Sequence, residues 1–266
     1  MLFEKRVQKF IDKKKFLPAG DHQVVIAEMK TLIAASAVQL TFELPHAYFH
    51  NFKTIYVYPD FYYSEGMQQY NAGEVHKSGQ IYLSWVDFLE GYLNPNNARN
   101  LGLHEMAHAL RLENMIQNKE YGYFKWSDIQ EFNHYTVIES NRIKAGEESL
   151  LLSYAATYYH EFFAVVIEVF FEQPKQLKEY HPPLYAVTAR LLRQDPFEIV
   201  QEIVEWHLLV KSYEFNDGIF VPDVFVDYFC QVQFIIVVSS VFSSGRHFNL
   251  SLFLRLVILV GIGVFF

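Results

Sequence analysis

The sequence predicts an α+β fold that is mainly helical and contains a small mixed sheet. Short segments rich in β-branched and aromatic residues predict the strands, and longer segments with apolar residues at helical spacing predict the helices. The chain has 266 residues, of which 51% are hydrophobic, so it can bury the core of one sizeable domain.

The N-terminal segment, residues 1–16, is predicted to form an amphipathic basic helix. It carries six lysine and arginine residues and lacks the apolar core of a secretory signal, so we expect the chain to begin in the cytoplasm. A second helix is expected over residues 21–38, where the apolar residues have helical spacing and Asp21 can cap the first turn.

Two strands are predicted next, at residues 54–58 and 80–84, where β-branched and aromatic side chains are enriched. Pro59 ends the first strand. The asparagine-rich loop 94–97 then offers good helix-capping residues, so a third helix is expected to begin near it.

The remaining segments are predicted to be helical or irregular. Residues 114–149 are polar and show little periodicity. A helix is expected over residues 159–171, ended by Pro174, and two more over residues 183–193 and 196–211.

The third helix carries the motif His104-Glu105-Met106-Ala107-His108. A step of four residues places both imidazoles on one helical face, close enough to share one metal ion, and Glu105 can take a proton from a metal-bound water. A polar stripe on the surface is the alternative. The neighbouring residues are apolar or small, however, and burying these polar groups is costly unless something pairs with them. The motif therefore indicates a zinc-dependent peptidase.

A third ligand is expected on the helix over residues 159–171. Glu161 and Glu168 are seven residues apart and share one face of an otherwise apolar helix, and burying two carboxylates together calls for a cation or a proton. We predict that Glu161 is the third ligand and that Glu168 accepts a hydrogen bond from a ligand histidine. His160 is a rival ligand, and an ordinary solvated position is the alternative for Glu168.

Charge and cysteine content exclude other kinds of site. A net charge of −8 gives no general attraction to nucleic acid, so a nucleic-acid partner is not expected. Cys230 is the only cysteine, which excludes an intramolecular disulfide and a thiolate zinc cluster, so histidine and carboxylate must hold the metal.

The composition changes after Lys211, which divides the chain into a domain over residues 1–211 and a hydrophobic tail over residues 212–266. The final apolar run, residues 250–266, is at the lower edge of the length that spans a bilayer, and Arg255 interrupts it. Two interpretations stay open: a helical hairpin buried against the protein or at an interface, and contact with the inner face of a membrane.

Several short motifs occur together in order, namely residues 78–85, 100–108, 154–164, 170–174, 181–185 and 193–196. Together they resemble the Mlc titration factor A family of zinc-dependent peptidases, which is related in catalytic-domain fold to the anthrax lethal factor protease domain. The resemblance extends over about residues 21–196. It implies a zincin-type (gluzincin) metallopeptidase domain with an H-E-x-x-H active-site helix.

The resemblance also implies roles for individual residues. His104, His108 and Glu161 hold one zinc ion, Glu105 is the general base, and Tyr154 stabilises the oxyanion. The segment 158–160 departs from the family pattern, and the tail has no counterpart in it.

The expected substrate is a peptide or protein, and an aminopeptidase is one form that the enzyme could take. We expect the strand 80–84 to present an open edge along which an extended peptide pairs. The family name implies an alternative function, in which the protein sequesters a transcriptional repressor of sugar uptake and peptidase activity is secondary.

Overall fold

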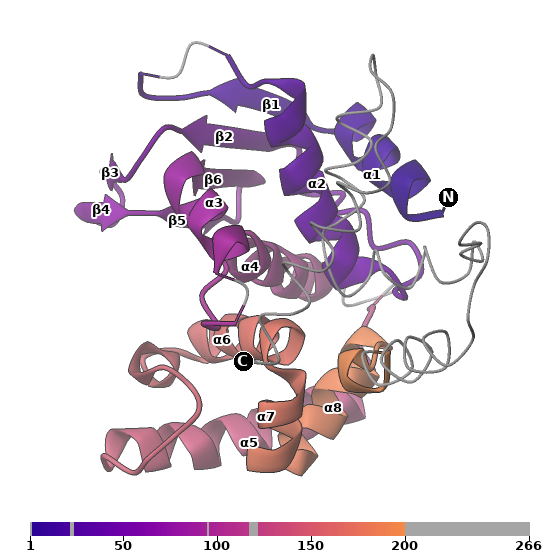
Figure 1. Ribbon diagram of the computed structural model, residues 1–266, viewed down its shortest axis with the longest axis vertical. Helices are drawn as coiled ribbons and strands as arrows, with labels where there is room; N and C mark the ends of the chain where they lie inside the picture. The colour runs from indigo at the N-terminus through magenta and orange to yellow at the C-terminus, as the bar shows by residue number, and fades with distance from the viewer. Residues whose placement is uncertain (1, 22–23, 95, 117–121, 200–266) are drawn as a thin grey trace, which may run out of the picture.

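The computed structural model describes residues 2–21, 24–94, 96–116 and 122–199, and it confirms a mainly helical α+β fold with a small mixed sheet (Figure 1). The strands are β1 (Lys15–Pro18), β2 (Thr54–Tyr58), β3 (Tyr62–Ser64), β4 (Gln69–Asn71), β5 (Gly73–His76) and β6 (Gln80–Ser84). The helices are α1 (Leu2–Lys13), α2 (Ala27–Thr41), α3 (Trp85–Leu93), α4 (Leu101–Ile116), α5 (Trp126–Lys144), α6 (Tyr159–Glu172), α7 (Pro174–Tyr180) and α8 (Pro182–Leu192), with a short 3-10 helix η1 (Ser153–Ala156).

The four-stranded sheet has the order β1-β2-β6-β5. β1, β2 and β6 are parallel, and β5 pairs antiparallel with β6. The predicted strands 54–58 and 80–84 are confirmed as β2 and β6 with the same bounds. The prediction that residues 80–84 present an open edge is wrong, because β5 folds back onto β6 and takes the edge position.

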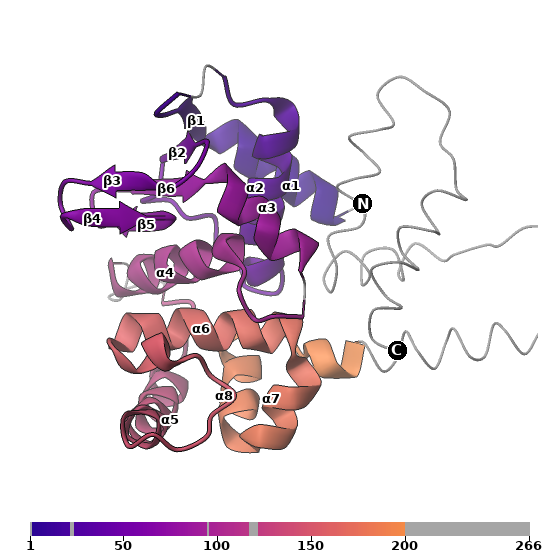
Figure 2. The ribbon, with the colours of Figure 1, turned by 60° about the vertical axis from the view of Figure 1, so that its left-hand side comes forward.

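Helix α4 lies in the middle of the molecule, between the sheet and α6 (Figures 1 and 2). On the sheet side, Ile55, Ile81 and Leu83 are fully buried, and on the α6 side so are Phe162, Val166 and Phe170. Helices α5, α7 and α8 lie beyond α6. This layering places the polar groups of α4 and α6 face to face inside an apolar core.

Several helices differ from the prediction. α3 and α7 were not expected, and the helix predicted over residues 1–16 ends at Lys13, before residues 15–18 form β1. α2 begins at Ala27 rather than near Asp21, because the preceding residues Val24, Val25 and Ile26 are β-branched and remain outside the helix. α5 occupies the polar stretch 114–149, where no helix was expected. Its buried side includes polar groups, so the hydrophobic period is weak.

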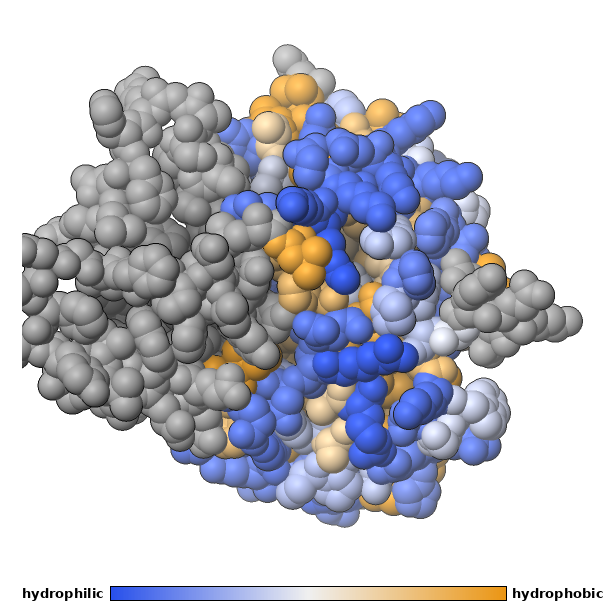
Figure 3. Space-filling view, turned by 90° about the vertical axis from the view of Figure 1, so that its right-hand side faces the viewer, coloured by the Kyte–Doolittle hydropathy of each residue, from blue (hydrophilic) through white to orange (hydrophobic). Residues whose placement is uncertain are grey.

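The surface around α1 agrees with a basic amphipathic helix. Phe3, Val7 and Phe10 are buried on its inner side, and the face of the molecule that carries α1 is mostly hydrophilic in its described part (Figure 3). Most of the helix predicted over residues 196–211, and all of the tail 212–266, lie outside the described residues. Among the described helices, none combines the length and apolar character needed to cross a membrane.

Candidate metal centre

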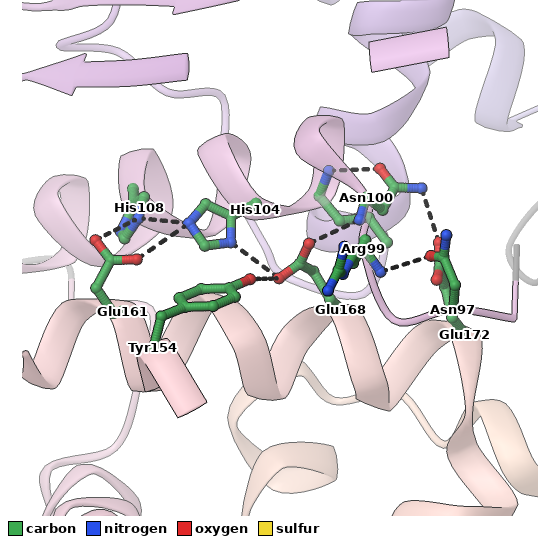
Figure 4. Close-up of polar contacts among 10 residues, drawn as sticks. Asn97, Arg99, Asn100, His104, His108, Tyr154, Glu161, Glu168 and Glu172 are labelled. Carbon is green, nitrogen blue, oxygen red and sulfur yellow. Dashed lines mark hydrogen bonds and ion pairs between the residues drawn. The ribbon is translucent and has the colours of Figure 1, made fainter. Parts of the chain in front are cut away.

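His104 and His108 lie on the side of α4 that faces α6 (Figure 4). The helix begins at Leu101 because the Asn100 side chain caps it: its Oδ1 accepts a hydrogen bond from the backbone N–H of Leu103 at 3.0 Å. The four-residue step then brings the two Nε2 atoms of His104 and His108 to 3.1 Å from each other.

Glu161, in the first turn of α6, points its carboxylate at both imidazoles. Its Oε2 lies 3.3 Å from His104 Nε2, and its Oε1 lies 3.6 Å from His108 Nε2. One ligand atom from each of the three residues lies within 4.8 Å of the others. Two imidazole nitrogens and one carboxylate oxygen that converge in this way fit a single divalent metal cation.

The protonation of the two histidines also fits a shared cation. Although burial opposes it, the carboxylates of Glu168 and Glu161 raise the pKa of His104 well above its usual value. Burial and the nearby His104 lower the pKa of His108 to about 3. In the absence of metal, the charged form of His104 is therefore favoured, whereas His108 stays neutral at neutral pH and keeps one nitrogen lone pair free.

Glu168, two turns further along α6, holds His104 in one orientation. Its Oε2 lies 2.9 Å from His104 Nδ1, and its Oε1 accepts a hydrogen bond from the backbone N–H of Asn100 at 2.7 Å. Glu168 is only 2% exposed, which excludes the solvated alternative. When Nδ1 donates to Glu168, the Nε2 lone pair of His104 is directed at the cluster.

Glu105 lies beside the cluster, on the side of α4 that touches the edge strand β5. A β-carbon added at Gly73 would come within 2.6 Å of Glu105 Cδ, so the close approach of the strand requires glycine there. Glu105 is 4% exposed, and its Oε2 has no hydrogen-bond partner among the described residues. Burial, with the nearby carboxylates, raises its pKa to about 8.

Tyr154, on η1, lies with its ring 6.1 Å from the His104 ring, measured between centroids. Its hydroxyl donates to Glu168 Oε2 at 3.2 Å. Burial and the carboxylate of Glu168 raise the pKa of this phenol, so it stays a hydrogen-bond donor at neutral pH.

His160 occupies the rim. Its Nε2 lies 3.4 Å from Glu161 Oε1, but the side chain is 58% exposed and its ring stacks on Tyr158. It is not one of the three residues whose ligand atoms converge. The two tyrosines of the segment 158–160 are also exposed beside it.

Three further residues support the cluster and were not predicted. Asn100 connects Glu168 with Glu172, donating from Nδ2 to Glu172 Oε1 at 3.1 Å. Gly73 admits Glu105, as described above. The sequence gives only a weak signal for these three residues. Asn100 lies one helical turn before His104, whereas Gly73 and Glu172 come near the cluster only in the folded chain.

The cluster opens onto a cleft of about 1010 Å³. One wall is a stripe of α4 side chains that extends from Leu101 to Met115, and another is the continuous segment 69–75, which includes all of β4 and most of β5. Tyr154, His160 and Glu161 contribute from the side of α6. The cleft is long enough to hold an extended chain past the cluster, because α4 alone runs about 20 Å along it.

Comparison with known proteins gives one family and several relatives. The model of the glucose-regulated metallo-peptidase M90 family matches residues 1–193. An uncharacterized protein of Synechocystis sp., slr2042, is 28% identical over 211 residues, which are 73% of this chain and 76% of the relative. Mlc titration factor A of Edwardsiella ictaluri is 27% identical over 210 residues, or 72% and 78% of the two chains. The protein of the same name from Salmonella agona is 30% identical over 131 residues, 47% of this chain and 49% of its own.

Proposed function

This chain belongs to the glucose-regulated metallo-peptidase M90 family, and from that membership we propose that it is a zinc-dependent peptidase. The observation that carries the proposal is the convergence of His104, His108 and Glu161 beside the buried carboxylate of Glu105. The expected relation to the anthrax lethal factor protease domain, and with it the gluzincin type of fold, stays a prediction.

The donor set favours one zinc ion held by His104, His108 and Glu161. Three protein ligands without a thiolate are typical of catalytic zinc, which keeps a further position for water or substrate. A bound zinc ion would lower the pKa of that water and polarise the carbonyl group of the scissile bond.

Glu105 is proposed as the general base. Its Oε2 is without a protein partner among the described residues, and a cation bound at the cluster would favour the ionised carboxylate, which can accept a proton from the attacking water. As the carbon–nitrogen bond breaks, Glu105 returns this proton to the leaving amine. Tyr154, whose side chain lines the cleft, is proposed to donate a hydrogen bond to the substrate carbonyl oxygen as that oxygen becomes negative.

The edge strand β5 is proposed to bind the substrate backbone. The carbonyl of Ala72 accepts a hydrogen bond from the N–H of Ser84 at 2.6 Å. This bond determines which residues of β5 form hydrogen bonds with β6 and which do not. In such a ladder every second residue directs its backbone groups away from its partner strand, so those of Gly73 and Val75 point to the open edge. An extended peptide that adds a strand there would pass alongside Glu105.

The proposal is tested by hydrolysis with and without metal. The purified chain is stripped with a chelator, reloaded with zinc and incubated with fluorogenic amino-acid substrates and internally quenched peptides. We expect cleavage that the chelator abolishes and zinc restores, and the two substrate types distinguish removal of a terminal residue from internal cleavage. Absence of chelator-sensitive cleavage would contradict the peptidase function.

A regulatory function is the second candidate, because several relatives are named Mlc titration factor A. In that case the chain would bind a transcriptional repressor of sugar uptake, and the metal cluster need not take part. Comparing repressor capture by the native chain and by the Glu161→Ala variant separates the two functions. Equal capture, together with no hydrolysis by either protein, would favour the regulatory function.

A further inference from the structure

Arg111 lies on the stripe of α4 that lines the catalytic cleft. Leu101, His104, His108, Arg111 and Met115 follow one another at intervals of three or four residues, and all five line the cleft. Arg111 therefore follows His108 by nearly one helical turn, which is about 4.5 Å along the helix axis.

The guanidinium of Arg111 is half-buried, and none of the described residues supplies a counter-charge. Its NH2 group contacts the neutral side-chain oxygen of Asn133 at 3.4 Å, and its Cζ lies 5.4 Å from the centre of the Phe163 ring. Within the described part of the chain, no carboxylate forms an ion pair with it. Arg142 and Arg190, in contrast, each pair with two carboxylates although both are less deeply buried.

Leaving a partly buried cation without an anion costs free energy, and a protein keeps such an arrangement when a ligand supplies the anion. Burial lowers the pKa of Arg111 from its usual value. The ring of Phe163 and the amide of Asn133 hold the planar guanidinium in place without neutralising it. Such a group is suited to a carboxylate, which it can bind through two parallel hydrogen bonds.

The direction of β5 tells which part of a substrate would reach Arg111. Gly73, at the start of β5, packs against Glu105, whereas Gly79, just beyond its end, packs against Asn51. The N–H of Asn51 donates to Glu113 at 3.0 Å, so β5 and α4 run in the same direction. A peptide paired antiparallel to β5, the slightly more stable arrangement, would place the residues before its cleaved bond towards the Arg111 end.

This inference rests on the peptidase function proposed above. We propose that Arg111 is a specificity-determining residue that binds a carboxylate of the substrate. In the antiparallel arrangement the carboxylate belongs to an aspartate or glutamate side chain about one to three residues before the cleaved bond, since strand residues are about 3.3 Å apart. If the peptide runs parallel instead, a free C-terminal carboxylate would reach the same group.

The test measures binding separately from turnover. Full-length Glu105→Gln protein loaded with zinc is titrated into three labelled peptides by fluorescence anisotropy. The first has glutamate before the scissile position and an amidated C-terminus. The second has glutamine at that position and the same amidated C-terminus, so it is neutral at both sites. The third has glutamine at that position and a free C-terminal carboxylate. We expect one of the two carboxylate peptides to bind about tenfold more tightly than the neutral peptide. Which of them does so identifies the source of the carboxylate.

Variants at Arg111 test whether this residue causes the preference for a carboxylate peptide. Arg111→Gln should abolish it, and Arg111→Lys should retain part of it, because the charge remains but the planar fork is lost. Arg99→Gln is the matched control, since Arg99 also lines the cleft but lies before the start of α4. It should leave the ratio of affinities unchanged.

Three results would overturn the inference: equal affinity for all three peptides, an unchanged preference in folded Arg111→Gln, or an equal loss in Arg99→Gln. Thermal melting of each variant establishes whether it folds. Even if Arg111→Gln does not fold, the three peptides compared on the protein with Arg111 intact still show whether a carboxylate peptide is preferred. Hydrolysis by the chain with Glu105 intact is recorded in parallel. An Arg111-dependent preference without hydrolysis would reject the peptidase function but retain the carboxylate site.

Discussion

Replacing Gly73 by alanine should reduce hydrolysis strongly while leaving the metal cluster intact. The new β-carbon would lie 2.6 Å from Glu105 Cδ and 2.7 Å from its Cγ, and real β-carbons keep about 3.4 Å or more from such atoms. Glu105 must therefore move by about 1 Å, since β5 is held in the sheet by β6. A displacement of about 1 Å at a reacting group can cost about 100-fold in rate.

The assay compares kcat/KM, bound zinc and thermal stability for Gly73→Ala and the native chain. We expect a loss of about 100-fold in kcat/KM, unchanged zinc content, and about 1–3 kcal/mol of destabilisation from overpacking. Gly66→Ala is the control, because a β-carbon at Gly66 would meet only Ser64 Oγ, at 3.9 Å. A folded Gly73→Ala protein with native kcat/KM would refute the placement of Glu105 as base against β5.

Three other changes test separate parts of the cluster. Glu161→Ala should lose most bound zinc, measured by atomic absorption; native zinc content would remove Glu161 from the ligand set. Glu168→Gln should weaken zinc binding by about 10–100-fold in a chelator competition, because His104 loses the carboxylate that orients it; unchanged affinity would contradict that role. For Glu172, burial raises the pKa from 4.5 to about 7. The charged form is thus disfavoured by folding, and stability is lost as the pH rises from about 4.5 to 7. Glu172→Gln should therefore stabilise the protein by about 1–3 kcal/mol at pH 8 and by little at pH 4, in denaturant titrations; equal effects at both pH values would contradict the shift.

Local sequence patterns predicted those parts of the fold and site that depend on local spacing. β2 and β6 were found with their observed bounds because their β-branched and aromatic residues are concentrated in short runs. The pair His104 and His108 was found because one helical turn separates them. The prediction of Glu161 and Glu168 used the same argument, since carboxylates at this spacing interrupt an otherwise apolar helix.

The features that were missed depend on contacts between distant segments. β5 has a glycine and two polar residues among its four, so it carries no strand signal, and it becomes the edge strand only by pairing with β6. In α5, Glu139 is buried, and its carboxylate accepts hydrogen bonds from Arg142, Ser149 and Tyr180. A polar residue on the buried side weakens the apolar pattern by which a helix is recognised. That no described carboxylate pairs with Arg111 likewise cannot be recognised until its neighbours in the fold are known.

In the proposed function, one metal ion held by His104, His108 and Glu161 makes this chain a peptidase, with Glu105 as its base. The most direct measurement is a titration of the metal-free protein with zinc during continuous hydrolysis of a quenched peptide, carried out in parallel with Glu105→Gln. We predict that the rate rises linearly and stops rising at one zinc per chain, and that Glu105→Gln binds the same one equivalent without hydrolysis. Hydrolysis that is independent of zinc, or a Glu105→Gln protein that matches the native rate, would contradict the claim.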